Sequence, residues 1–136
     1  MSQKTPSIVT IHSSRGRLVA DHVRMARRFG ERLRGLLGTR CLPGGSGLWI
    51  QPCGSVHTIG MRYAIDVVFM DRAGMILRVL RNLRPGRFGF APRGCVAVLE
   101  LRAGECDSRG LAEGDQLSTS VVADNETSIQ GARYER

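Results

Sequence analysis

Residues 65–83 read IDVVFMDRAGMILRVLRNL, and this stretch decides the fold because it predicts two strands joined by a tight turn. The first run, 65–70, is apolar except for Asp66 and indicates a strand with apolar residues on both faces. The tetrapeptide Asp71-Arg72-Ala73-Gly74 is typical of a type I turn, with aspartate first and glycine fourth. Because apolar residues resume at 75–83, we predict a β-hairpin over the whole stretch.

Further strands are predicted on both sides of this hairpin. Residues 18–25 fit either a strand or the beginning of a helix. The other predicted strands are the mostly apolar runs at 8–11, 48–50 and 95–101, and a last strand at 116–122 that follows the turn Glu113-Gly114-Asp115. Strands that follow one another without regular helical crossovers favour an antiparallel sheet over a doubly wound one.

One helix is predicted by a clear period, and its apolar face consists of Phe29, Leu33, Leu36 and Leu37. Gly38 suits the left-handed end of that helix. Residues 105–112 predict a second, short helix. We therefore expect a mainly β (α+β) fold: a small antiparallel sheet or half-open barrel with one core helix and one short helix.

The chain has 136 residues, which suits one domain. We place this domain at 8–122, between a frayed start at 1–7 and a polar, disordered tail at 123–136. No run of 18 apolar residues is present, so we expect no membrane span. The first residues, MSQKTPSIVTIHSS, lack the apolar core of a signal peptide, and we therefore expect a cytoplasmic protein.

The formal net charge is +8, and the excess lies in the first half of the sequence. Residues 1–62 hold ten basic and two acidic residues, whereas 63–136 are balanced. Arginine suits carboxylate and phosphate, so one interpretation is an acidic protein partner or nucleic acid. The other is the codon usage of a bacterial genome rich in G and C. Because the basic residues are not interleaved with aromatic ones, we expect any nucleic-acid binding to be weak and non-specific.

Several segments together resemble the domain of unknown function 192 family (DUF192), also catalogued as the uncharacterised protein family UPF0127. The segment HTIGMRYAIDVVFMD at 57–71 resembles the signature of this family. Three further segments resemble the family's flanking motifs: ERLRGLLGTRCL at 31–42, PCGSVHT at 52–58 and VLELRAG at 98–104. The resemblance spans about 16–122. It implies a compact, mainly β fold and no established activity. The motif at 60–64 begins with Gly60, where many relatives have tryptophan.

The four cysteines are far apart and form no CxxC pair: Cys41, Cys53, Cys95 and Cys106. We expect free thiols in a reducing compartment. Cys53 and His57 are four residues apart, a spacing compatible with quiet packing, a ligand pocket, a thiolate nucleophile or two zinc ligands. A structural zinc site needs four ligands, and no second pair stands at ligand spacing, so we expect no metal and no cofactor.

Two acidic residues stand in predicted apolar strands, Asp66 in 65–70 and Glu100 in 95–101. A buried carboxylate needs a partner, and Arg62 is the nearest candidate for Asp66. Each carboxylate is interpreted either as a structural salt bridge or as part of one shared pocket.

Three hypotheses about function follow, because no catalytic motif of adequate specificity is present. The preferred one is a non-enzymatic binding or accessory domain with a polar pocket for a small molecule. That candidate pocket comprises Cys53, His57, Thr58, Met61, Arg62, Asp66 and Glu100. The second hypothesis is a small hydrolase that uses His57 with a carboxylate. The third is a basic interaction protein that docks on an acidic partner or nucleic acid.

Overall fold

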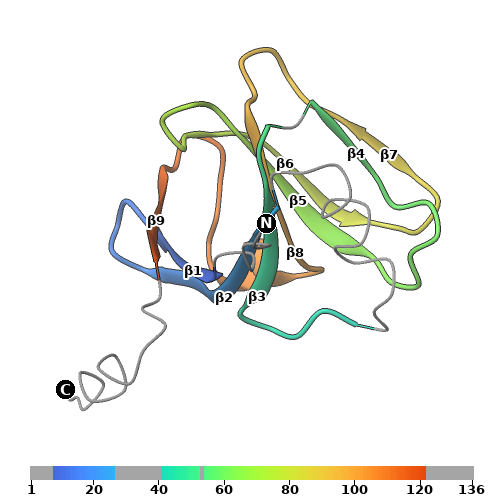
Figure 1. Ribbon diagram of the computed structural model, residues 1–136, viewed down its shortest axis with the longest axis horizontal. Helices are drawn as coiled ribbons and strands as arrows, with labels where there is room; N and C mark the ends of the chain where they lie inside the picture. The colour runs from blue at the N-terminus through green and yellow to red at the C-terminus, as the bar shows by residue number, and fades with distance from the viewer. Residues whose placement is uncertain (1–7, 27–40, 53, 122–136) are drawn as a thin grey trace, which may run out of the picture.

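The computed structural model describes residues 8–26, 41–52 and 54–121 (Figure 1). Within them, seven strands form one sheet in the order β6-β5-β8-β3-β2-β1-β9, and two form a separate ribbon, β4–β7. The elements are β1 (Ile8–Ser13), β2 (Leu18–Ala26), β3 (Ser46–Ile50), β4 (Ser55–His57), β5 (Ile65–Met70), β6 (Ile76–Leu83), β7 (Phe88–Phe90), β8 (Ala97–Arg102), α2 (Glu105–Ser108) and β9 (Leu117–Val121).

The prediction of a mainly β fold is confirmed. The predicted core helix around Leu33 lies outside the described residues, as do Cys53, the start at 1–7 and the tail at 123–136. The predicted short helix is present as α2, which is only four residues long. No helix within the described ranges is long and apolar enough to cross a membrane.

The hairpin predicted at 65–83 is confirmed, because β5 and β6 pair in antiparallel register. One carboxylate oxygen of Asp71 accepts hydrogen bonds from the N–H groups of Ala73 and Met75, each at 2.9 Å. Gly74 has a φ of 85°, in the left-handed region that glycine adopts without strain. The turn therefore forms for the reason that its sequence indicates.

One pair of neighbouring strands departs from the predicted antiparallel sheet. β2 and β3 run parallel, with Val23 opposite Gly47, whereas the other neighbours in the seven-stranded sheet are antiparallel. A parallel pair needs a long crossover connection, and the residues between 26 and 46 supply one. The prediction missed this pair because it assumed short hairpin connections throughout.

The seven-stranded sheet is open, but its two edges approach each other. Met75, just before β6, forms an isolated antiparallel bridge with Gln116, just before β9. Beside this bridge, the Ile76 N–H donates to the Asp115 carbonyl at 2.7 Å. The sheet therefore curls until its edges meet at one end (Figure 1).

Each face of the sheet has its own apolar core, which explains why β5 is buried on both faces. On one face, Val68 and Met70 pack with residues of β1, β2, β8 and α2. On the other face, Ile65, Val67 and Phe69 pack with residues of β3, β4 and β8. We call these the first core and the second core. All six side chains of β5 are at most 1% exposed.

The β4–β7 ribbon was not predicted, because strands of three residues are too short to show a period. Val56 and Gly89 lie opposite each other in the ribbon, and Val56 belongs to the second core. A Cβ at position 89 would lie 2.8 Å from a methyl carbon of Leu80 on β6. Glycine therefore allows β7 to pack closely on β6, and the opposite face of the ribbon faces solvent.

Candidate functional site

Asp66 is 1% exposed, and backbone donors occupy both of its carboxylate oxygens. Oδ1 accepts a hydrogen bond from the Asn82 N–H at 2.9 Å, and Oδ2 accepts from the N–H groups of Gly104 and Cys106 at 3.0 Å each. The predicted partner, Arg62, is exposed instead, so that prediction was wrong. Three amides satisfy the buried carboxylate and tie β6 and the beginning of α2 to β5.

The Cys106 thiol is fully buried close to this carboxylate. Burial raises the pKa of Cys106 to about 12, and the negative charge of Asp66 and a side-chain hydrogen bond with it act in the same direction. A thiol that stays protonated is a poor nucleophile, so Cys106 contributes packing rather than chemistry. Within the described ranges Cys41, Cys95 and Cys106 take part in no disulfide bond.

Glu100, 6% exposed, lies on the opposite face of the sheet from Asp66. In the β5–β8 pair, Glu100 stands opposite Val67, whereas Asp66 stands opposite Leu101. Residues opposite each other in a ladder share a face, and successive residues alternate between faces. The sheet therefore separates the two carboxylates, and they do not meet in the single pocket that the sequence suggested.

Thr58 is buried and anchors the loop that leads into β7. Its hydroxyl donates a hydrogen bond to the Arg84 carbonyl at 2.5 Å and accepts one from the Arg87 N–H at 2.9 Å. Met61, which follows in the same segment, is buried in the second core. These two candidate residues therefore act as supports, and they fix the segment that carries His57.

His57 is exposed at the end of β4, opposite Phe88 of β7. The centroids of their rings are 6.1 Å apart, and the rings are tilted by 58°. Among the described residues His57 forms no hydrogen bond or ion pair with a carboxylate, so the pair required by the hydrolase hypothesis is not formed. No three His, Cys, Asp or Glu side chains within these ranges gather closely enough to hold a metal ion.

The outer face of the ribbon is aromatic and exposed. Phe88 is 57% exposed and Phe90 is 67% exposed. Their ring centroids are 6.2 Å apart, and the two ring planes differ by only 14°. We call His57, Phe88 and Phe90 the aromatic face. A half-buried strand usually places its large apolar side chains toward the core and its polar ones toward solvent. In β7 the glycine faces the core and the two phenylalanines face solvent.

The part of the chain that surrounds β7 is rich in arginine and contains no acidic residue. Between Asp71 and Glu100 the sequence contains no acidic residue and six arginines: Arg72, Arg78, Arg81, Arg84, Arg87 and Arg93. Within the described ranges only Arg81 of these six forms an ion pair, with Asp107 at 2.8 Å. Arg78 donates to the Phe90 carbonyl at 3.3 Å, which places its guanidinium beside the aromatic face.

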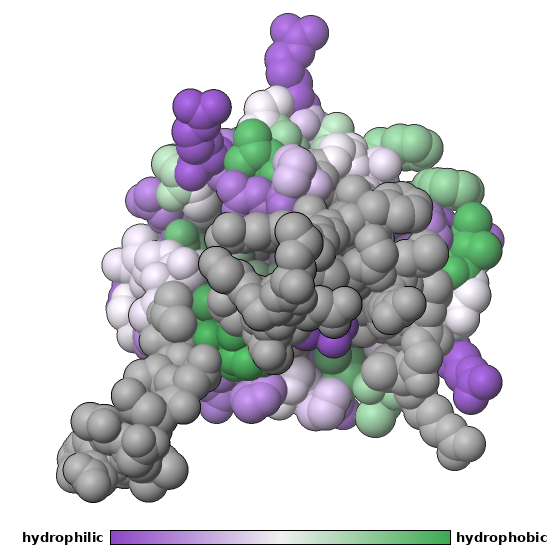
Figure 2. All heavy atoms as spheres, viewed as in Figure 1, coloured by the Kyte–Doolittle hydropathy of each residue, from purple (hydrophilic) through white to green (hydrophobic). Residues whose placement is uncertain are grey.

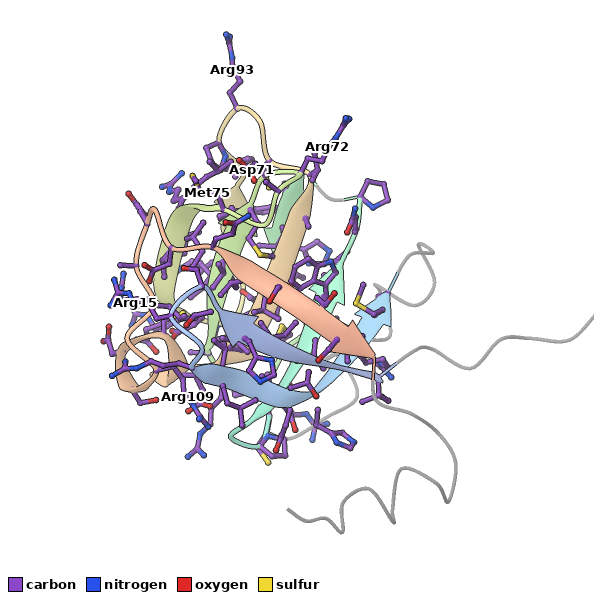
Figure 3. The ribbon with its side chains drawn as sticks, turned by 90° about the vertical axis from the view of Figure 1, so that its left-hand side faces the viewer. Arg15, Asp71, Arg72, Met75, Arg93 and Arg109 are labelled. Carbon is purple, nitrogen blue, oxygen red and sulfur yellow. The ribbon has the colours of Figure 1, made fainter. Side chains whose placement is uncertain are left out.

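Three of these arginines lie in the loops that flank β7. Arg84 and Arg87 belong to the loop that enters the strand, and Arg93 belongs to the loop that leaves it. Figure 3 shows Arg93 and Arg72 extending into solvent from two loops at the same end of the molecule. In Figure 2, hydrophobic side chains project at the right-hand edge, on the side where Figure 1 places β4 and β7. The surface therefore combines exposed rings with uncompensated positive charge.

Sequence reasoning missed this surface because charge was summed over residues 63–136. The acidic residues that balance this half stand at its two ends, and the interval 72–99 has none. The tetrapeptide Arg87-Phe88-Gly89-Phe90 could have indicated this surface. In a strand that packs on a core, glycine between two aromatic residues predicts that the glycine faces the core and the two rings face solvent.

Fold and site define a small, mainly β domain with an exposed aromatic and basic face. Residues 10–119 match the model of the DUF192 family, which is described as an uncharacterised ACR. The chain belongs to this family, as its motifs indicated. No function is established for the family, and the function of this chain is therefore unknown.

Three relatives illustrate the likeness. A UPF0127 protein of Thermococcus sibiricus is 28% identical over 116 residues, which cover 82% of this chain and 74% of the relative. A crystal structure of a protein of unknown function from Novosphingobium aromaticivorans matches with a TM-score of 0.71 at 19% identity, over 87% of this chain and 99% of that one. A protein of Sinorhizobium meliloti, provisionally assigned as a transcription regulator, matches with a TM-score of 0.70 at 22% identity, over 88% and 97%. The two structures show the fold alone.

Proposed function

We propose that this protein is a non-enzymatic binding domain that holds an anionic ligand on the β4–β7 ribbon. The observation that carries the proposal is the exposed aromatic face, 57% and 67% exposed at its two phenylalanines. Beside it lie four arginines that form no ion pair within the described residues: Arg78, Arg84, Arg87 and Arg93. Folding alone gives no reason to turn two phenylalanines outward, and exposed apolar residues rimmed by charge mark binding surfaces.

Two residues of the candidate pocket, Thr58 and Asp66, contribute to this proposal as supports of the ribbon. The carboxylate of Asp66 is satisfied by three amides, and Thr58 fixes the loop before β7, so both hold the ribbon and its surroundings in place. A rigid support for exposed contact residues is what a binding site requires. The cytoplasmic location expected from the sequence stays a prediction.

The charge on the loop before β7 can be tested directly. We expect labelled polyglutamate and labelled polyphosphate to bind the wild-type protein at low salt, as measured by fluorescence anisotropy. The double variant Arg84→Gln/Arg87→Gln should bind both polyanions more weakly, because it removes two positive charges next to β7. The backbone groups of these residues, not their guanidinium groups, bond to Thr58, so the variant should still fold.

A matched control separates this surface from net charge. The β1–β2 turn lies on the opposite side of the molecule from the ribbon (Figure 1) and carries two exposed arginines, Arg15, which pairs with Asp115 at 3.2 Å, and Arg17. Arg15→Gln/Arg17→Gln removes the same two charges from the protein and should leave polyanion binding close to wild type. Equal binding by wild type and the Arg84/Arg87 double variant would rule out the proposed surface.

A further inference from the structure

We infer that the ligand of the aromatic face is single-stranded nucleic acid, whose unpaired bases stack on Phe88 and Phe90 while the neighbouring arginines contact its phosphates. This inference rests on the proposed function and names the class of ligand. It also departs from the sequence-based expectation, which found the basic and aromatic residues apart. Arg84, Arg87 and Arg93 flank the two phenylalanines in the chain, and the ribbon turns both rings outward beside them.

The geometry of the two phenylalanine rings favours bases over other partners. Their planes differ by 14° and their centroids are 6.2 Å apart, so the rings form two neighbouring, nearly parallel surfaces. His57 stands across the ribbon from Phe88 with its ring tilted by 58°, and adds a third aromatic surface. Every base has a flat face that stacks on such rings, and base–aromatic stacking does not depend on sequence.

The charges fit a nucleic-acid backbone. Of the six arginines between Asp71 and Glu100, Arg81 is paired with Asp107, whereas Arg84, Arg87 and Arg93 flank β7 at both ends. A strand whose bases lie along β7 would carry its phosphates past these loops. Arginine binds phosphate through a planar fork that also stacks on bases.

Two other anionic partners fit the surface less well. An acidic peptide satisfies the arginines, but its carboxylates have no flat apolar face to cover the rings. Apolar side chains that insert into an anionic bilayer project beyond the charged residues around them. Phe88 and Phe90 instead lie on the face of a strand between two charged loops. Both partners remain as outcomes of the experiment.

The experiment measures binding of a labelled oligothymidylate of about 16 nucleotides, the upper end of the site size of a small single-strand-binding fold. We expect a Kd in the range of about 10⁻⁶–10⁻⁴ M, because the contacts carry no base-specific hydrogen bonds. Phe88→Ala and Phe90→Ala should each weaken binding at least about fivefold, the lower limit of a lost stacking contact. Phe88→Tyr and Phe90→Tyr keep an aromatic ring and should bind like wild type.

Arginine and phenylalanine variants should differ in their dependence on salt. For single strands, the slope of log K against log salt changes by about 0.7 for each phosphate contact. Arg84→Gln/Arg87→Gln should therefore make the slope shallower by about 1.4, whereas the phenylalanine variants should lower affinity at an unchanged slope. Leu18→Ala is the apolar control, since Leu18 is 41% exposed on β2, a strand of the large sheet outside the ribbon.

The outcomes separate failure of this inference from failure of the proposed function. If the phenylalanine variants bind the oligonucleotide like wild type while Arg84→Gln/Arg87→Gln weakens binding of every polyanion, the surface binds anions but not stacked bases. Binding of phosphatidylserine vesicles or polyglutamate that depends on Phe88 and Phe90, without binding of the oligonucleotide, would also overturn the inference. If the arginine variant binds all polyanions like wild type, both proposals fail.

Discussion

Asp66 shows what can be learned from a single residue in a sequence. A carboxylate in an apolar strand must be satisfied when it is buried, and this much was predictable. The identity of its partners was not, because they are backbone N–H groups of Asn82, Gly104 and Cys106, which are 16 to 40 residues away in the chain. A sequence gives no information on which backbone N–H groups come close to a side chain in the fold. The prediction therefore chose the nearest basic side chain, Arg62.

Replacing Asp66 tests whether this carboxylate is structural. In Asp66→Asn the side-chain NH₂ must face at least one backbone donor, and the remaining hydrogen bonds lose their charge assistance. We expect a loss of about 2–4 kcal/mol in the free energy of unfolding, measured by urea denaturation. Asp71→Asn is the control, because Asp71 also accepts two backbone N–H groups, but in an exposed turn where asparagine is well accepted. An unchanged or higher stability of Asp66→Asn would contradict this structural role.

At the scale of elements, the hairpin β5–β6 was predictable and the ribbon β4–β7 was not. β5 and β6 have long apolar runs and a turn with a fixed residue pattern, so local sequence determines them. β4 and β7 are three residues each and lie 30 residues apart, and they form because Val56 and Gly89 pack on the second core. Such a contact depends on the completed sheet, which a local pattern does not contain.

The approach of the two sheet edges depends on Gly74. Its φ is 85°, and an added Cβ would collide with the carbonyl oxygen of Leu117 at the beginning of β9. We expect Gly74→Ala to destabilise the protein by clearly more than the roughly 1–2 kcal/mol of a left-handed alanine, as measured by thermal or urea unfolding.

Gly16 is the matched position for this comparison. It has a similar φ of 78°, but an added Cβ would meet nothing within 4 Å. Gly16→Ala should therefore show the backbone effect alone. Equal destabilisation by the two substitutions would mean that the contact between the sheet edges contributes nothing to stability.

At the scale of the whole molecule, the sequence located the excess charge but not the surface that we propose to bind anions. The +8 excess lies in residues 1–62, while the acid-free interval between Asp71 and Glu100 belongs to the half with no net charge. An average over this half hides the separation of its charges. Among the described residues that follow the interval, Glu100 lies on β8, Glu105 and Asp107 lie on α2, and Glu113 and Asp115 lie before β9. The candidate pocket failed for a related reason, because strand pairing decides which face each carboxylate takes.

The most direct test of the central claim is to map the binding surface by NMR on the ¹⁵N-labelled protein. Polyphosphate and the oligothymidylate should be titrated separately at low salt. If the ribbon is the binding site, the amide shifts should change at residues 54–58 and 84–93, and signals of the β1–β2 turn around Arg15 should stay in place. Changes centred on that turn, or spread evenly over all arginines, would contradict the account.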